Sequence, residues 1–184
     1  MFGSFRLRAS HWMAAILASL SLGKPAHASI VQISPGYFQC STKPGMMARE
    51  DIGTYSAHRE IHGRIHLVAD RTDPDWSPTA AFLFELNGKR AVGVAVRKVR
   101  GDPDHIYAGV WKHETPIILL ARWDIAAWMP LSVKLSENGQ LTATAGQFSK
   151  SVNVGRGTVL RRVIHCNSGA FDFALRPDTP SRSN

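Results

Sequence analysis

Cysteine is scarce in this sequence: Cys40 and Cys166 are its only two cysteines among 184 residues. Two thiols cannot build a cysteine-only zinc site or a disulfide-dense small scaffold. Beyond the N-terminal segment, no apolar run reaches the ~20 residues that a membrane-spanning helix needs. No segment combines ordinary helix length with caps and a 3.6-residue apolar period. These absences disfavour a zinc-ribbon protein, a helical bundle and a membrane-anchored mature chain.

Several motifs of catalysis and cofactor binding are also missing. The sequence has no G-x-S-x-G nucleophile motif, no phosphate loop and no dinucleotide fingerprint. We therefore expect no cofactor. The 22 Lys and Arg against 14 Asp and Glu give a net charge of +8, which favours anionic partners. A nucleic-acid partner would rest on this charge alone and is not expected.

The N-terminal residues have the pattern of a secretory signal peptide. Arg6 and Arg8 precede the apolar run 12–22, and a small-x-small cleavage site ends at Ala28. Cleavage there would remove three basic residues and no acidic one, lowering the net charge from +8 to +5. A buried N-terminal helix is the alternative. We expect residues 1–28 to be removed and the protein to be secreted or periplasmic, with no membrane span afterwards.

An oxidising compartment makes a disulfide the default state of an isolated cysteine pair, so we predict a Cys40–Cys166 bridge rather than two thiols. The length suits one domain. We assign residues 29–176 to that domain. The Pro- and Ser-containing residues 177–184 are assigned to a flexible tail. The oligomeric state is left open.

The body of the chain has the pattern of short strands joined by tight turns. Asn87-Gly88 and Asn138-Gly139 each separate two segments of alternating hydrophobicity, and Asn167-Ser168-Gly169 does so near the C-terminus. Such spacing predicts an all-β fold, an antiparallel β-sandwich of the jelly-roll type. The expected strands are 30–33, 37–40, 61–68, 81–86, 90–96, 105–111, 116–122, 131–135, 141–145, 151–154, 159–166 and 171–175.

Three local features carry their own expectations. Residues 41–50 contain Lys-Pro-Gly and are expected to form a loop. The continuous apolar run 117–120 predicts a strand covered on both faces. Residues 123–128 could form one helical turn after Asp124.

The segment 131–141, Leu-Ser-Val-Lys-Leu-Ser-Glu-Asn-Gly-Gln-Leu, resembles the strand–turn–strand of concanavalin A-like and laminin-G-like jelly rolls. Hairpins over 82–96 and 163–173 fit the same layout. Many domains of that fold bind or cleave polysaccharides, so the resemblance implies a jelly roll and suggests glycans as ligands.

The catalytic signatures of that fold are incomplete in this sequence. The E-x-D-x-E of family 16 glucanases is absent. Residues 59–61, 64–66 and 107–111 echo the motifs of alginate-lyase-like enzymes. Arg64 stands where those enzymes have Gln, however, and the Lys before Ala108-Gly109 is missing. The catalytic roles of the lyases are therefore not carried over.

Two strands place polar and aromatic side chains on one face. In the first, the same-face residues are His58, Glu60, His62, Arg64 and His66. This row could bind an anionic sugar, a His–Glu pair could move a proton, or the row could be a solvated sheet face. A metal is not expected, because one strand does not supply convergent ligands.

In the second strand, His105, Tyr107, Gly109, Trp111 and His113 share a face. Tyr and Trp rings can stack on sugars, but they could equally fill the sandwich core.

We therefore expect a secreted or periplasmic binding protein for acidic polysaccharide or envelope glycan, without enzymatic activity. The predicted ligand-binding residues are Glu60, His62, Arg64, His66, Tyr107, Trp111 and His113. One alternative is a polysaccharide-degrading, lyase-like enzyme in which His62 or His66 is the base, Tyr107 the acid and Arg64 the neutraliser of a carboxylate. Another is a structural envelope protein.

Arg156, Arg161 and Arg162 form a basic patch that could face anionic polymers. The aspartates of the loop 69–77 are assigned to a turn rather than to Ca²⁺.

Overall fold

The structure is a computed structural model, and it describes residues 28–55, 59–72, 75–88, 90–112 and 118–176. In these ranges the chain forms thirteen strands and one short 3-10 helix. Their bounds are β1 Ser29–Ser34, β2 Tyr37–Ser41, β3 Met47–Asp51, η1 Gly53–Tyr55, β4 Glu60–Asp70, β5 Thr79–Leu86, β6 Arg90–Lys98, β7 His105–Lys112, β8 Ile118–Asp124, β9 Met129–Leu135, β10 Gln140–Ala145, β11 Phe148–Asn153, β12 Val159–Asn167 and β13 Gly169–Leu175.

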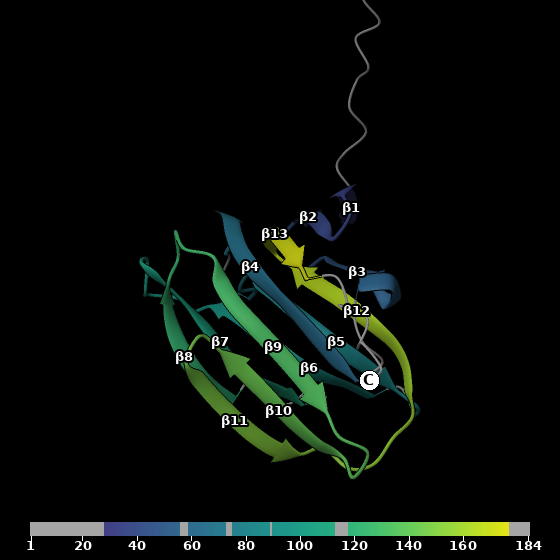
Figure 1. The fold of residues 1–184 in the computed structure, drawn as a ribbon. Coiled ribbons are helices and arrows are strands. Elements are labelled where there is room, and N and C mark those ends of the chain that lie inside the picture. The colour runs from purple at the N-terminus through teal and green to yellow at the C-terminus, as the bar shows by residue number, and fades with distance from the viewer. Residues whose placement is uncertain (1–27, 56–58, 73–74, 89, 113–117, 177–184) are drawn as a thin grey trace, which may run out of the picture.

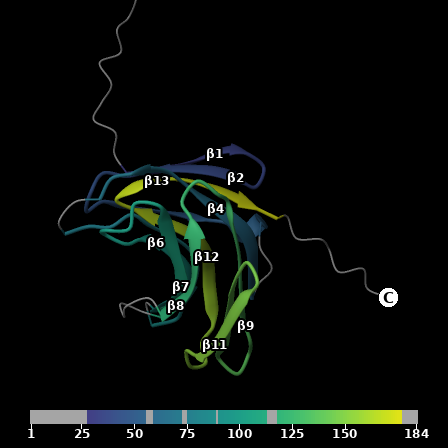
Figure 2. The same ribbon diagram turned by 90° about the vertical axis from the view of Figure 1, so that its left-hand side faces the viewer.

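The strands pair into two antiparallel sheets. The seven-stranded sheet has the order β1-β2-β13-β4-β9-β10-β11, and the six-stranded sheet has the order β3-β12-β5-β6-β7-β8. Figure 1 shows β4, β9, β10 and β11 in front of β5, β6 and β7. In Figure 2, turned by 90°, β6, β7 and β8 lie on the left and β4 and β9 on the right. The predicted all-β sandwich is confirmed.

The period-two alternation of the sequence produces the core between the sheets. On β6, Val92, Val94 and Val96 face inward and are fully buried, and Phe82 and Phe84 of β5 meet them from the neighbouring strand. Burying a side chain of this size contributes roughly 1.5–3 kcal/mol relative to leaving it exposed. β5 and β6 therefore direct one apolar face at the other sheet, as the core of a sandwich requires.

The predicted disulfide is confirmed. Cys40 lies on β2 in one sheet and Cys166 on β12 in the other, with 6.6 Å between their Cα atoms and a sequence separation of 126. Both side chains are buried in the core. The bridge therefore links the two layers of the sandwich covalently.

Two of the three predicted turns are hairpins. Asn87-Gly88 joins the paired strands β5 and β6, and Asn138-Gly139 joins β9 and β10. Gly139 has φ of +84°, and a Cβ atom there would lie 2.4 Å from the carbonyl carbon of Gly155. Only glycine satisfies both this positive φ and this close approach.

The third turn, Asn167-Ser168-Gly169, does not close a hairpin, and this part of the prediction was wrong. β12 belongs to the six-stranded sheet and β13 to the seven-stranded sheet, so the chain crosses between layers here. Ser168 takes a left-handed conformation, with φ of 51°. The sequence pattern was misleading because a tight turn can redirect a strand as well as reverse it.

Two further local predictions need correction, and the turn expected after Asp124 is present as a hydrogen-bonded turn. Part of the expected loop 41–50 forms β3, an exposed edge strand that pairs with β12 by backbone hydrogen bonds and so lacks apolar alternation. β8 is the other edge of the same sheet, and Ile118 and Leu119 are exposed rather than covered on both faces. After β8 the chain makes a single turn, in which the Ala126 amide donates to Asp124 Oδ1 at 2.8 Å. In the described ranges no helix is long and apolar enough to cross a membrane.

Candidate functional site

The outer face of the seven-stranded sheet carries the first predicted row of polar residues. Ile61, Ile65 and Leu67 of β4 are buried in the core, as their alternation predicts. The intervening side chains face outward, and they are Glu60, His62, Arg64 and His66. The fifth member of the predicted row, His58, lies outside the described residues.

An aromatic residue from a loop lies against this row. Trp128, between β8 and β9, has its ring centroid 5.4 Å from that of His66 and 6.3 Å from that of Tyr37 on β2. The guanidinium carbon of Arg64 lies 5.0 Å from the Trp128 ring centroid, a cation–π contact. We call these four residues, Tyr37, Arg64, His66 and Trp128, the Trp128 cluster.

The carboxylates of Glu60 and Asp172 on this face are both engaged with neighbouring side chains. Glu60 Oε1 contacts His62 Nε2 at 2.9 Å, and Glu60 Oε2 lies 3.9 Å from Lys134 Nζ. Asp172 accepts a hydrogen bond of 2.7 Å from the Tyr37 hydroxyl, which raises the pKa of that hydroxyl. Tyr37 therefore stays protonated at neutral pH and keeps its ring in place beside Trp128.

Two adjoining hollows open beside the Trp128 cluster. One, of about 300 Å³, is lined by Arg64 and Arg176, and the other, of about 160 Å³, by His62 and Arg176 together with hydroxyl-bearing side chains. Both include Gly63 and Pro130 in their walls. Neither Arg64 nor Arg176 forms a salt bridge with a carboxylate in the part of the chain that the structure describes.

The register explains how these side chains meet. Arg64 is opposite Ala174 on β13 and Pro130 on β9, two residues that leave space on either side of the guanidinium. The Arg176 backbone amide donates to the His62 carbonyl at 3.0 Å, so Arg176 lies beside His62, two residues along β4 from Arg64 and on the same face. Guanidinium groups can bind the negative charge of a ligand, and an aromatic ring and hydroxyl groups nearby can bind its sugar rings and hydroxyls.

The second predicted row lies on the opposite surface of the molecule. Ile106 and Val110 of β7 are buried in the core, while Tyr107 and Trp111 point outward from the six-stranded sheet. The alternative that these two rings fill the sandwich core is therefore wrong. The last residue of the predicted row, His113, lies outside the described residues.

Trp111 reaches across the sheet to a buried histidine. Its ring centroid lies 5.6 Å from that of His165 on β12, at 65° between the ring planes. His165 is 2% exposed, and neither of its ring nitrogens has a hydrogen-bond partner within the described residues. Desolvation, with a smaller contribution from Arg49, lowers its pKa to about 4. The imidazole is therefore neutral at physiological pH.

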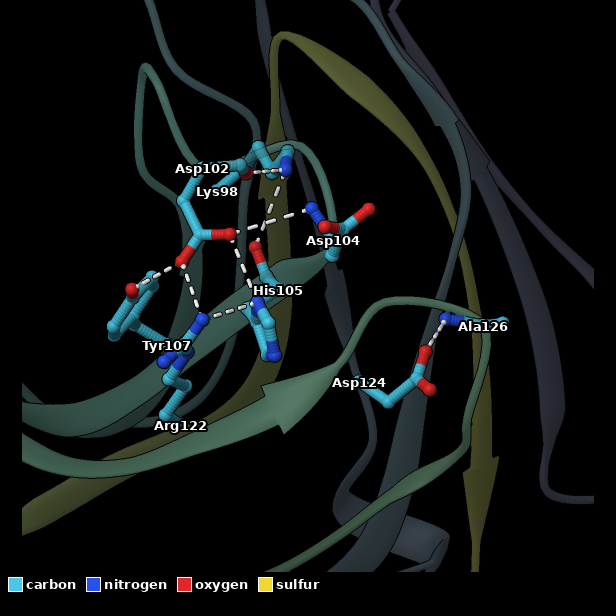
Figure 3. A network of polar contacts seen from close by, with 8 residues as sticks. All are labelled: Lys98, Asp102, Asp104, His105, Tyr107, Arg122, Asp124 and Ala126. Carbon is cyan, nitrogen blue, oxygen red and sulfur yellow. Dashed lines mark hydrogen bonds and ion pairs between the residues drawn. The ribbon is translucent and has the colours of Figure 1, made fainter.

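Tyr107 belongs to a polar network at the turn between β6 and β7 (Figure 3). The Asp102 carboxylate accepts a hydrogen bond from the Tyr107 hydroxyl, contacts His105 Nδ1 at 2.8 Å and lies 3.4 Å from Arg122 Nη2. Lys98 donates to the carbonyls of Asp102 and, at 3.3 Å, of His105.

The contacts in this network shift the pKa values of both Asp102 and Tyr107. Hydrogen bonds from Tyr107 and His105 hold the pKa of Asp102 well below its usual range, and the same carboxylate raises the pKa of Tyr107. Arg122 Nη2 also lies 2.7 Å from His105 Nδ1, but that nitrogen cannot donate to Asp102 and accept from Arg122 at once. We assign the proton to Nδ1, facing Asp102. The network ties down the β6–β7 turn, with the Asp102 carboxylate as the shared partner of Tyr107, His105 and Arg122.

The structure does not bring the lyase-like residue set together. His62, His66 and Arg64 lie on the outer face of one sheet, and Tyr107 lies on the outer face of the other. A proton donor and a base must both reach one substrate, and the sandwich core separates these groups.

Two further sequence expectations concern the basic patch on β12 and a possible metal ion. Arg161 and Arg162 are consecutive on β12 and point to opposite sides, Arg161 towards Glu85 and Arg162 towards the Gly53 carbonyl, so the basic patch is not one surface. Within the ranges that the structure describes, no group of three His, Cys, Asp or Glu side chains is arranged to hold a metal ion.

Sequence reasoning missed half of the Trp128 cluster and the second arginine. Period two along β13 would have placed Asp172, Ala174 and Arg176 on one outward face, and the same rule applies to Tyr37 on β2. Trp128 carries no such signal, because it lies in a loop and reaches β4 only through the tertiary fold.

Fold and pairing together define an antiparallel β-sandwich that resembles the concanavalin A-like jelly roll. No protein-family model and no curated protein matches the sequence. Among solved structures, the carbohydrate-binding module CBM66 from Bacillus subtilis is similar with a TM-score of 0.52 and 8% identity, over 83% of this chain and 92% of that one. A beta-glucanase of Bacillus licheniformis is similar with a TM-score of 0.50 and 8% identity, over 81% of this chain and 82% of that one. At such identity the likeness concerns the fold.

Proposed function

We propose that the protein binds acidic polysaccharides through the outer face of the seven-stranded sheet, without catalysing a reaction on them. The observation that carries the proposal is the hollow of about 300 Å³ lined by Arg64 and Arg176, in which Arg64 also contacts the Trp128 ring. Two guanidinium groups without a carboxylate partner among the described residues suit an anionic sugar, because arginine matches a carboxylate with two parallel hydrogen bonds.

The aromatic part of the face supports the same ligand class. Sugar rings have apolar C–H faces that stack on indole and phenol rings, while their hydroxyls need polar partners nearby. Trp128 and Tyr37 supply the rings, and Ser132 and Thr144 line the smaller hollow with hydroxyl groups. The fold similarity to a carbohydrate-binding module is compatible with this use of the sandwich.

Arg64→Gln is expected to weaken binding of polygalacturonate about tenfold, because a hydrogen bond to a charged group is lost. Trp128→Ala is expected to weaken it as well, by removing both the ring and the contact that positions Arg64. The measurement is affinity electrophoresis or calorimetry at low salt, with dextran as the uncharged polymer. Raised salt should reduce the affinity of the wild-type protein.

Arg97→Gln is the matched control, because Arg97 is an exposed arginine on the outer face of the other sheet. It removes the same charge without touching the hollow, so binding should stay within about twofold of wild type if contacts rather than net charge carry the affinity. Equal weakening by Arg97→Gln and Arg64→Gln, or equal binding of dextran and polygalacturonate, would contradict the proposal.

We also infer that the protein is exported and loses residues 1–28. Two observations support this: the cysteines form a buried disulfide, which an oxidising compartment maintains, and the first strand within the described residues begins at Ser29, directly after the predicted cleavage site. The intact mass of the exported form is expected to correspond to a chain that begins at Ser29. A mass that includes the first 28 residues would contradict the cleavage.

A further inference from the structure

A hollow of about 440 Å³ lies at one end of the six-stranded sheet, whereas Tyr37, Arg64 and His66 of the Trp128 cluster lie on the seven-stranded sheet. Four strands or their turns contribute to it. Its lining residues are Arg49, Glu85, Leu86, Gly88, Arg90, Ala91, Leu160 and Arg161. We call it the arginine hollow.

A single carboxylate organises two of the arginines. Arg49 Nη1 on β3 contacts Glu85 Oε1 at 3.1 Å, and Arg161 on β12 approaches Glu85 Oε2 with Nε at 2.9 Å and Nη2 at 2.7 Å. The Glu85 side chain is 15% exposed, against 45% for Arg49 and 61% for Arg161. The acid therefore lies beneath the two guanidinium groups, whose remaining N–H donors face solvent and have no other partner in the described part of the chain.

The third arginine is held by neutral groups. Arg90 Nη1 donates to the Val154 carbonyl at 3.3 Å, and Arg90 Nη2 donates to the Arg156 carbonyl at 2.9 Å. Carbonyl oxygens orient a guanidinium without cancelling its charge. With three arginines and one glutamate in the lining, the arginine hollow has two positive charges in excess.

A backbone irregularity adds an apolar wall. Val159 pairs with Leu86 and Arg161 with Glu85, so Leu160 is the extra residue of a bulge in β12. Bulges redirect side chains at sheet edges, and Leu160 is 61% exposed at the rim of the hollow. Ala91 continues this apolar surface from β6.

We propose that the arginine hollow is a binding site for phosphate monoesters. A monoester carries close to two negative charges at neutral pH, and its oxygens match the fork of an arginine side chain. A monoanionic carboxylate would leave one excess charge unmatched, and Glu85 already occupies one carboxylate position. Leu160 and Ala91 would contact the organic part of the ester.

Three arginines attached to three strands hold their donors in place before the ligand arrives. Glu85 fixes two of them and two main-chain carbonyls fix the third. Little side-chain entropy is then lost on binding, which favours affinity for a small anion. The site does not depend on the Trp128 cluster, which lies on the other sheet.

The test is calorimetric titration of the full chain with glycerol 3-phosphate at about pH 8, where the phosphate is close to dianionic. Saturable binding is expected, with acetate at least about tenfold weaker because it lacks the second charge. Arg161→Gln is expected to weaken glycerol 3-phosphate about tenfold through the loss of a charged hydrogen bond. Arg97→Gln, on the same outer face but outside the hollow, should leave it within about twofold.

A second arm uses vesicles that contain phosphatidic acid, with phosphatidylcholine vesicles as the control. Binding to the first vesicles alone, lost in Arg161→Gln, would assign the ester to a lipid headgroup, whereas binding of glycerol 3-phosphate alone would assign a soluble ester. The inference fails if neither probe binds saturably, or if Arg97→Gln weakens binding as much as Arg161→Gln.

The two sites are separated by their variants. Arg64→Gln is expected to lower polygalacturonate binding and leave glycerol 3-phosphate unchanged, and Arg161→Gln is expected to do the reverse. If one of these variants does not weaken its expected ligand, only the proposal for that site fails, and the proposal for the other site is unaffected.

Discussion

Reduction of the Cys40–Cys166 disulfide is expected to lower the free energy of unfolding by about 4–5 kcal/mol, the largest single effect that we expect in this protein. The bond spans 126 residues, so it removes much of the conformational freedom of the unfolded chain. It also joins the two sheets through the core, where both sulfurs are buried. A loss of this size is a large fraction of the stability of a typical domain.

The measurement is equilibrium unfolding in urea with and without a reductant, after counting thiols to confirm that the bond has opened. The reduced chain should unfold at lower urea and with a steeper dependence, because its unfolded state exposes more surface. The double variant Cys40→Ala/Cys166→Ala is the control, since its unfolding curve should not respond to reductant. An unchanged midpoint for fully reduced wild-type protein would show that the bridge contributes little.

Acidification is expected to destabilise the protein by about 3 kcal/mol through His165 alone, between pH values of about 6.5 and about 4. Burial lowers the pKa of His165 in the folded chain to about 4, against the usual 6.5. Below pH 6.5 His165 therefore binds a proton in the unfolded chain, whereas in the folded chain it binds that proton only near pH 4. This contribution is fully present above pH 6.5, decreases as the pH falls, and stops changing below pH 4.

His165→Gln isolates this effect, because glutamine is polar and similar in size but does not titrate. The free energy of unfolding is measured for both proteins at several pH values from about 7.5 to 4, and the difference between their pH dependences is compared with the expected decrease. The carboxylates and the exposed histidines titrate in both proteins and cancel in this difference. Parallel curves for wild type and His165→Gln would contradict the burial argument.

Local physics made much of the fold predictable. The Asn-Gly pairs allow the positive φ of tight hairpins, and β5–β6 and β9–β10 form as expected. Period-two alternation on β4 and β7 correctly divided the side chains between two faces, although for β7 it left open which face is buried. β3 escaped detection because an edge strand needs only backbone pairing and carries no apolar stripe. The apolar run in β8 misled for the related reason that hydrophobicity does not show whether a strand lies at an edge.

The sequence by itself determined which side chains share a face, because that depends only on the geometry of one extended strand. It also limited any disulfide to one pairing, because the sequence has only two cysteines, and the structure shows that this bond forms. Only the tertiary structure decided that β4 and β7 lie in different sheets, so that His66 and Tyr107 face opposite sides of the molecule. It alone brought Trp128 to Arg64, and Arg49 and Arg161 to Glu85. Sheet membership comes from pairing between residues far apart in the chain, and no local pattern encodes it.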